Sequence, residues 1–103
     1  MTRTIEIARS TEIARFTVKS DEEAAFLAER DAMRKAAKQH FEGFVDETLA
    51  ELEDGSYLSI WTWEAREHCA RAMAQVDHVA PVASWLAHMA KDISMEFGVV
   101  VRT

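Results

Sequence analysis

Four histidines are the side chains best suited to proton transfer near neutral pH: His40, His68, His78 and His88. Imidazole titrates in this range, so each of them is a candidate general base. His40 ranks first because it ends a helical stretch and precedes Phe41, beside the apolar face of that stretch. His68 ranks second because it lies on the helical stretch that follows two tryptophans. An exposed or capping histidine is the alternative for each.

An alternating aromatic stretch, GSYLSIWTWEA at residues 55–65, is the best candidate for the wall of a binding pocket. Side chains two apart on a β-strand share a face, so Tyr57, Trp61 and Trp63 form one aromatic stripe. Trp63 is the strongest pocket candidate because it stands at a strand end, where clefts open. Packing in the core or at a subunit interface is the alternative, since Trp and Tyr often bury large areas there.

The spacings typical of metal and nucleotide sites are missing from the sequence. It has no H-x-x-x-H or H-E-x-x-H pattern, no G-x-G-x-x-G and no P-loop. His68, His78 and His88 are ten residues apart, and Pro81 interrupts any helix that they could share. The single cysteine, Cys69, lies among alanines in a helical pattern, which favours a buried thiol over a nucleophile. We therefore expect no metal and no cofactor.

Composition and charge limit the partners of the chain. Its 103 residues suit a single domain spanning residues 1–103. The net charge of −6 and the scattered basic residues disfavour nucleic acid and anionic membranes. The stretch 42–54 carries six acids and no base, and we interpret it as a solvated strand face. Without a secretory leader or a long apolar run, the chain is expected to be a soluble cytoplasmic protein.

Hydrophobic periodicity predicts the elements that position these residues. Period-two alternation predicts strands at 4–20, 44–52, 56–63 and 94–103. The tetrapeptide EIAR occurs at 6–9 and 12–15, so the first strand is either one long strand or a strand preceded by an extended arm.

Helical spacing predicts a first helix within residues 20–43. Ser20 and Glu23 match the S-x-x-E capping box at its start, and Gly43 suits its end. A second helical region begins at residue 64, with a further piece from Pro81 whose apolar face continues to Ile93. Asp-Gly at 54–55 predicts a tight hairpin between the second and third strands.

The resulting βαββαβ order predicts an α+β fold of the ferredoxin-like type, with a four-stranded antiparallel sheet and helices on one face. The third strand is apolar on both faces, because Leu58 and Ile60 lie opposite the aromatic stripe. Helices on one side would leave an apolar face uncovered. We therefore predict a homodimer in which the sheet of a second copy buries that face.

Four stretches resemble a known family: ARFTVKSDEEAAFL, GFVDETLAEL, YLSIWTWEA and MEFG. Over residues 11–100 the chain is similar to the antibiotic biosynthesis monooxygenase-like proteins of the dimeric α/β-barrel superfamily, most specifically in the junction at residues 61–64. The resemblance implies a homodimer whose sheets form a barrel, with a hydrophobic cleft between sheet and helices in each subunit. Some relatives oxidise phenolic or anthrone-like aromatics with O2 and without metal or flavin, others degrade haem, and others have no established activity.

Haem degradation is disfavoured by the residues that this branch of the superfamily uses. That branch relies on an Asn in the first strand, a Trp within the second helix and an axial His at the far end of that helix. The chain contains no Asn, the stretch 64–76 contains no Trp, and only His78 lies near the required region.

Cofactor-free oxygenation needs an ionisable aromatic substrate, a base and a dry apolar pocket. His40 or His68 would supply the base. Arg15, beside Phe16, could stabilise a bound phenolate, or could instead pair with an acid at an edge or interface. The candidate ligand contacts are Arg15, Phe16, Tyr57, Trp61 and Trp63. Three hypotheses stay open: an oxygenase of a phenol, anthrone or quinol, a dimer that binds an aromatic ligand without turnover, and an accessory dimer without a ligand.

Overall fold

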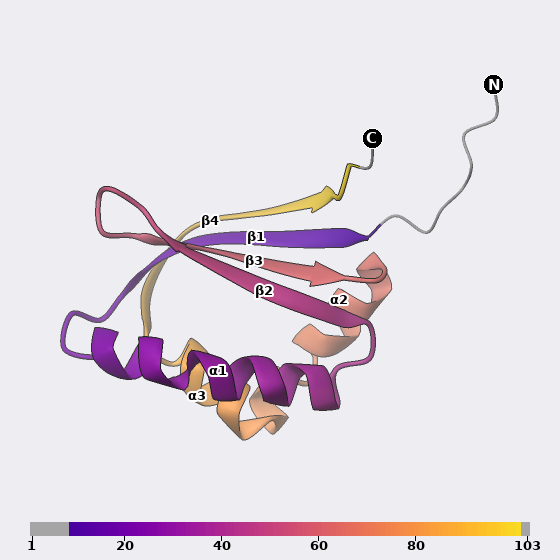
Figure 1. The fold of residues 1–103 in the computed structure, drawn as a ribbon, viewed down its shortest axis with the longest axis horizontal. Coiled ribbons are helices and arrows are strands. Elements are labelled where there is room, and N and C mark those ends of the chain that lie inside the picture. Colours follow the sequence, from indigo (N-terminus) through magenta and orange to yellow (C-terminus); the bar gives the residue numbers. More distant parts are fainter. Residues whose placement is uncertain (1–8, 102–103) are drawn as a thin grey trace.

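Four antiparallel strands form one sheet, and the helices of the described residues lie together on one side of it (Figure 1). The computed structural model describes residues 9–101. The strands are β1 (Ser10–Val18), β2 (Phe44–Glu51), β3 (Tyr57–Trp63) and β4 (Met89–Val99), in the order β2-β3-β1-β4. The helices are α1 (Glu23–His40), α2 (Arg66–Met73) and α3 (Ala80–Leu86), with the 3-10 helix η1 (Val76–His78) before α3. The predicted ferredoxin-like βαββαβ plan is confirmed.

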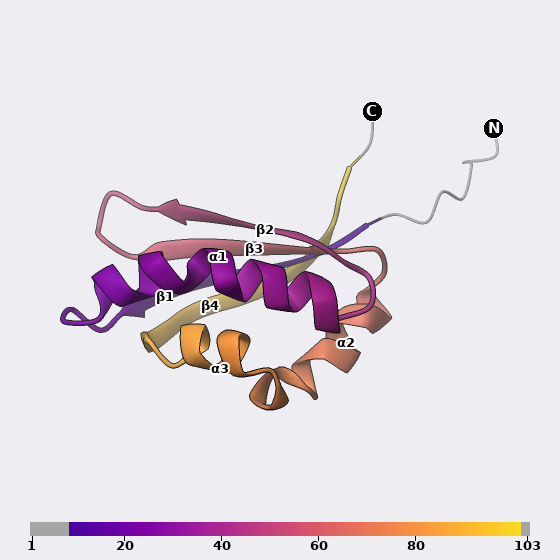
Figure 2. The same cartoon turned by 60° about the horizontal axis from the view of Figure 1, so that its bottom comes forward.

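Helix α1 lies along the sheet with α2 and α3 beside it (Figure 2). The predicted capping box at its start is wrong, because Glu22 is the N-cap residue and no side chain caps the helix. The Glu23 carboxylate instead accepts a hydrogen bond of 2.5 Å from the Tyr57 hydroxyl. Glu23 thus binds a tyrosine of the sheet instead of capping its own helix. None of the helices in residues 9–101 is both long and apolar enough to cross a membrane.

Two turns follow their predicted glycines. Gly43 has a φ of +81° between α1 and β2, and Gly55 has a φ of +87° in the β2–β3 hairpin. Only a residue without Cβ adopts these angles at little cost. The first strand begins at Ser10, so the second EIAR copy lies in β1, while most of the first copy lies outside the described residues.

The last helix is shorter and the last strand longer than predicted. Helix α3 ends at Leu86, and β4 begins at Met89 rather than at residue 94. Met89 pairs with Val18 of β1. The residues from Met89 to Ile93, which the helical pattern had included, therefore belong to a strand. Met89 and Ile93 are four apart, a spacing that fits the period of a strand as well as that of a helix.

The aromatic stripe faces the helices. Tyr57, Trp61 and Trp63 expose 2, 7 and 2% of their surface, so their own chain covers them and their placement at a subunit interface is wrong. The opposite face of the sheet carries Leu58 and Ile60, both half-buried. In the described part of the chain no helix lies over that face (Figure 1).

One end of the layer between sheet and helices is filled by aromatic rings. Phe26 and Trp85 stack with ring centroids 4.6 Å apart, and Trp85 Nε1 donates to the Phe26 carbonyl at 2.9 Å. Phe16 packs edge-on against both of these rings and stacks on Tyr57. This packed cluster anchors α1 and α3 on the sheet, because its four rings come from both layers.

Candidate functional site

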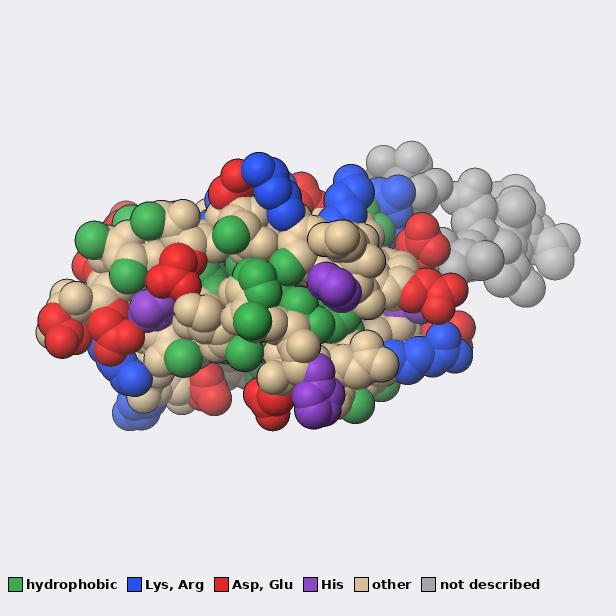
Figure 3. Space-filling view, turned by 90° about the horizontal axis from the view of Figure 1, so that it is seen from below, with side chains coloured by type: hydrophobic (Ala, Val, Ile, Leu, Met, Phe, Trp, Pro, Cys, Tyr) green, Lys and Arg blue, Asp and Glu red, His purple; other side chains and the backbone are tan. Residues whose placement is uncertain are grey.

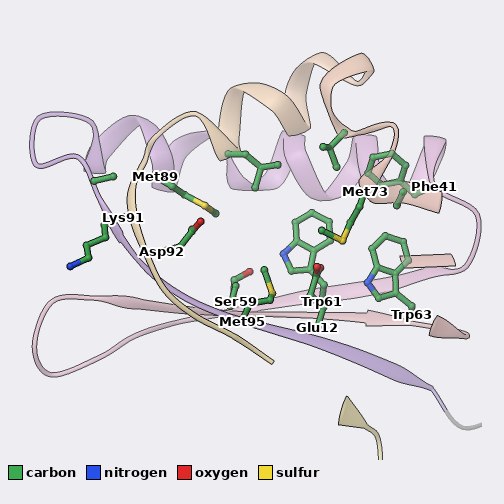
Figure 4. A pocket seen from close by; sticks show the side chains of 15 residues that line it. Glu12, Phe41, Ser59, Trp61, Trp63, Met73, Met89, Lys91, Asp92 and Met95 are labelled. Atoms are coloured by element: carbon green, nitrogen blue, oxygen red, sulfur yellow. The ribbon is translucent and has the colours of Figure 1, made fainter. Parts of the chain in front are cut away.

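Part of the same layer, from Trp63 of β3 to Met89 at the start of β4, is hollow. A cavity of about 440 Å³ lies between the sheet and the helices, and we call it the aromatic pocket. Trp61 and Trp63 of β3 form part of its wall, with Phe41 from the end of α1 (Figure 4). The two indole rings are nearly parallel, at 15°, with centroids 6.1 Å apart. They present a flat apolar surface that suits a flat ligand.

Small side chains explain why this part of the layer stays hollow. Ala14 and Ser59 lie on the sheet side of the pocket, while Ala72 and Ala90 line it from α2 and β4. None of these side chains is large enough to fill this space as Phe26 and Trp85 fill theirs in the packed cluster. The cavity therefore follows from the local choice of small residues within an otherwise aromatic layer.

Methionines and two charged residues line the pocket beyond the indoles. Met73 and Met95 are each about half exposed, and Met89 lies with them in the lining. Thioether side chains are flexible and adapt to the shape of an apolar ligand. Lys91 and Asp92 also line the pocket and are exposed. Figure 3 shows hydrophobic side chains gathered in the middle of the helix-side face, with charged side chains toward its edges.

Glu12 is the buried carboxyl of the aromatic pocket. It pairs with Trp61 across the sheet and exposes 7% of its surface. Figure 4 shows the carboxyl pointing from the sheet toward the indoles. Burial raises the pKa of Glu12 above its ordinary value, and a hydrogen bond with the Cys69 side chain lowers it in part. A carboxylate of raised pKa is the stronger base that proton abstraction near neutral pH requires.

The Cys69 thiol next to Glu12 is a structural group. It exposes 2% of its surface, as expected for a buried thiol. Burial raises its pKa to about 11, and the negative charge of Glu12 adds to this shift. The thiol therefore stays protonated at neutral pH and is a poor nucleophile.

The indole N–H of Trp63 is a buried donor without a hydrogen-bond partner in residues 9–101. Such groups are rare, because an unpaired buried donor costs free energy. Trp63 lines the aromatic pocket, and in Figure 4 its nitrogen lies on the side of the ring nearer Glu12. This nitrogen is closed off from the pocket as the side chains stand, because it has almost no accessible surface.

A second buried acid, Glu47 of β2, lies next to the pocket. Its side chain is fully buried and forms an ion pair with Arg30 of α1, Nε to Oε1, at 2.7 Å. Ser59, which lines the pocket, donates its hydroxyl to Glu47 Oε2 at 2.5 Å. The prediction of a solvated strand face is therefore wrong at this position. Period two places Glu47 on the helix-side face, where Arg30 reaches it.

Solved structures share this fold over nearly the whole chain. The cofactor-independent oxygenase SnoaB from Streptomyces nogalater is 26% identical, with a TM-score of 0.66 over 93% of this chain and 94% of that one. A candidate antibiotic biosynthesis monooxygenase from Bordetella bronchiseptica is 17% identical, with a TM-score of 0.76 over 92% of this chain and 99% of that one. The structural neighbours of this chain are antibiotic biosynthesis monooxygenase family proteins.

A further candidate from this monooxygenase family, from Caulobacter crescentus CB15, is 16% identical, with a TM-score of 0.70 over 92% of both chains. No family model and no curated protein sequence matches the chain. The resemblance stated from the sequence is thus confirmed at the level of structure. The monooxygenase neighbours show the fold, whereas the chemistry of this chain depends on its own residues.

The two histidines proposed as bases lie outside the aromatic pocket of this monooxygenase-like fold. His40 and His68 line a separate cavity of about 210 Å³, together with Arg71. His40 is exposed at the end of α1. The ring of His68 packs so closely on Gly43 that a Cβ there would have no room. The structure therefore does not bring either imidazole to the tryptophans.

The other predicted ligand residues are divided between two faces of the sheet. Arg15 points to the uncovered face and forms an ion pair with Asp54 at 2.6 Å, so it does not reach the pocket. Phe16 and Tyr57 belong to the packed cluster and are not among the residues that line the pocket. Trp61 and Trp63 are the predicted ligand residues that the pocket brings together.

His88 connects α1 to the start of β4. Its Nδ1 lies 2.8 Å from Glu22 Oε1 and its Nε2 lies 2.7 Å from Glu29 Oε2. Hydrogen bonds, first to Glu22 and then to Glu29, raise the pKa of His88. These contacts hold the chain where Met89 enters the pocket lining. Among residues 9–101, no three His, Cys, Asp or Glu side chains gather as a metal site requires.

Sequence reasoning from histidines overlooks Glu12, although one signal for it is present. Glu12 alternates with Ala14 and Phe16 on the inner face of the predicted first strand. A carboxyl at an inward position of an amphipathic strand is unusual, because burial penalises its charged form. That position in the sequence marks Glu12 as a candidate functional residue.

Proposed function

We propose that this protein is a small oxygenase that binds a flat aromatic substrate in the aromatic pocket and uses Glu12 as its general base. The observation that carries the proposal is the buried Glu12 carboxyl, of raised pKa, beside two indoles in an apolar cavity. SnoaB, a structural neighbour at 26% identity, is a cofactor-independent oxygenase, which supports the reaction class.

Proton transfer to Glu12 would begin the reaction. The carboxylate accepts a proton from the hydroxyl or the activated methylene of a phenol, anthrone or quinol, and the electron pair stays on the ring system. The resulting electron-rich anion reduces O2. For an anthrone, the ring methylene and one O2 yield a ring carbonyl and one water, so the substrate itself supplies the electrons and no external reductant is needed.

The apolar side chains of the pocket would support this chemistry. A ligand that fills the pocket would displace water from its apolar walls, which would protect a reactive anion and strengthen the hydrogen bonds around it.

A fluorescence titration separates binding from turnover. The chain has three tryptophans, so a Trp85→Phe variant reports only from Trp61 and Trp63, which both line the pocket. Titration with 2-naphthol, anthrone and a naphthoquinol under nitrogen should give saturable quenching by at least one of them. Admission of O2 should then consume that compound, as followed with an oxygen electrode.

Each other outcome of the titration has a definite meaning. Saturable quenching without oxygen consumption would make the protein a ligand-binding protein rather than an oxygenase. A lack of quenching by all three compounds would remove the pocket as a site for flat aromatics and would favour an accessory role.

We also propose that the uncovered face of the sheet packs against a second copy of the chain. Ile13, Leu58 and Ile60 lie together on this face, and an apolar sheet face of this kind is normally buried. Isologous pairing of the two faces would cover them in one step.

The Ile60→Asp substitution should convert a dimer into a monomer, because it places a charge at the centre of the apolar face. Sedimentation equilibrium measures the change in mass. Ala28→Asp, on an exposed position of α1, is the matched control and should leave the mass unchanged. A monomeric wild-type protein, or an Ile60→Asp variant that remains dimeric, would contradict this placement.

A further inference from the structure

The strand β4 is irregular where it lines the aromatic pocket. Its pairing with β1 shifts register between Arg15 and Phe16, and again between Thr17 and Val18. At each shift β4 has one residue more than β1, first Ile93 and then Ala90. An extra residue of this kind turns the following side chains to the other face of a sheet, and such irregularities are common beside active sites.

Asp92 lies between the two shifts and is turned inward by them. Strict alternation back from Met95, which lines the pocket, would place Ile93 and Lys91 on the inner face. Instead Asp92 pairs with Phe16, whose side chain is fully buried on the helix-side face. Directly paired residues of an antiparallel sheet share a face. The two shifts therefore bring a carboxylate to the wall of an apolar pocket.

Two acids and one base line the aromatic pocket, and the base points away from it. Glu12 and Asp92 are the acids, and Lys91 is the base. Figure 4 shows the Asp92 carboxyl on the side of β4 that faces the indoles, whereas the Lys91 ammonium extends away from them. Asp92 is exposed and takes part in none of the ion pairs within residues 9–101. Its negative charge can therefore act on a ligand.

We infer that the aromatic pocket takes a flat ring system that carries a cationic arm, such as a protonated amine, and that Asp92 selects this arm. The aromatic walls do not oppose a positive charge, because the face of an aromatic ring attracts cations. The inference rests on the proposed function, since it assumes that a flat aromatic ligand lies against the indoles, and it adds a charged group to that ligand.

The positions of Glu12 and Asp92 set the length of the ligand. Phe16, the partner of Asp92, is four residues after Glu12 on β1, which is about 13 Å along the strand. A single ring that stacks on Trp61 beside Glu12 is too short to reach Asp92. Fused rings with an aliphatic arm span the distance, so that an acidic proton is directed at Glu12 while the cation contacts Asp92.

Three matched probes test the inference. Each is a naphthol whose second ring carries a three-carbon arm, which ends in an ammonium, a hydroxyl or a carboxylate. Isothermal titration calorimetry at neutral pH, in the absence of oxygen, gives their dissociation constants. The wild-type protein should bind the amine about threefold to fivefold more tightly than the alcohol, and the carboxylate more weakly than the alcohol. Added salt should reduce this preference, because ions screen an exposed charge.

Substitutions separate the charge of Asp92 from that of the whole protein, whose net charge of −6 attracts cations in general. Asp92→Asn should bring the amine and the alcohol within about twofold of each other, and Asp92→Lys should make the carboxylate the tightest ligand. Asp77→Asn is the matched control. It removes the same charge from an exposed residue of η1, next to Val76 of the pocket lining, and should keep the wild-type preference.

The outcomes distinguish this inference from the proposed function. Equal affinities of the wild-type protein for all three probes, or a preference for the amine that persists in Asp92→Asn, would overturn the inference and leave the oxygenase proposal intact. Binding of unsubstituted naphthol alone would do the same. Lack of binding of all four naphthols, the unsubstituted one included, would overturn both.

A third result would support the inference and overturn the oxygenase alone. In that case the preference for the amine disappears in Asp92→Asn, but the wild-type protein consumes no oxygen with any of the bound naphthols, with anthrone or with a naphthoquinol. Asp92 would then select the ligand of a binding protein.

Discussion

Replacement of Glu12 by glutamine is expected to lower kcat by about 10²–10⁴-fold on any aromatic compound that the wild-type protein oxidises. The amide has nearly the shape of the carboxyl but cannot take up the substrate proton. The dissociation constant of the same compound should change by less than about tenfold, because the apolar walls of the pocket stay in place. Oxygen consumption measures the first quantity and anaerobic tryptophan quenching the second.

Glu53→Gln is the matched control for Glu12→Gln. It replaces an exposed acid in the β2–β3 loop and should leave both quantities at their wild-type values. Wild-type turnover in Glu12→Gln would exclude Glu12 as the base.

The raised pKa of Glu12 predicts a pH dependence of opposite sign for activity and for stability. Activity requires the carboxylate, so kcat/KM should fall as the pH is lowered through the raised pKa. The folded protein holds this proton at pH values where the unfolded chain, with the ordinary pKa of 4.5, has released it. The contribution of Glu12 to stability is therefore present at low pH and is lost as the pH rises toward the folded pKa.

Glu12→Gln removes the loss of stability that the buried Glu12 carboxyl causes as the pH rises. At pH 7 the variant should be at least as stable as the wild-type protein in urea denaturation, while it is far less active. Functional groups often carry such a trade-off. A variant that is both inactive and clearly less stable would instead indicate that Glu12 has a structural role.

Arg30→Met is expected to destabilise the protein by about 3–5 kcal/mol, the largest loss of stability that we predict. Methionine keeps much of the length of the side chain but leaves the Glu47 carboxylate buried without its cation. The Glu47 side chain is fully buried, so water cannot replace the lost partner. Urea denaturation at pH 7 measures the difference in the free energy of unfolding.

Arg34→Met is the matched control on the same helix. Arg34 pairs with Asp46 at 2.6 Å, and its exposure of 35% is close to the 28% of Arg30, but the Asp46 side chain is 53% exposed. A solvated pair of this kind contributes at most about 1 kcal/mol. Similar losses for Arg30→Met and Arg34→Met would show that burial of Glu47 is not the reason for either effect.

The periodicity of the sequence by itself determined the plan of the fold. Strand alternation in β1 and β3 sets which side chains share a face, because successive residues of a strand point to opposite sides. The helical spacing of Phe26, Met33, Ala37 and Phe41 predicted the buried face of α1, and all four are buried. Asp-Gly at 54–55 predicted the hairpin, since the turn needs a positive φ. These are local properties of the chain, and a single sequence contains them.

Only the tertiary structure decided which inward-facing residues would form a site. Glu12 and Glu47 occupy inward positions of two strands, but whether such a position meets packed rings, a cavity or a guanidinium depends on segments far away in the chain. Arg30 reaches Glu47 from α1, and Cys69 reaches Glu12 from α2. Glu23 is another example, because it does not cap its helix but accepts a hydrogen bond from the Tyr57 hydroxyl on a distant strand. Burial and pairing are sums over distant neighbours, so the pattern of one segment cannot specify them.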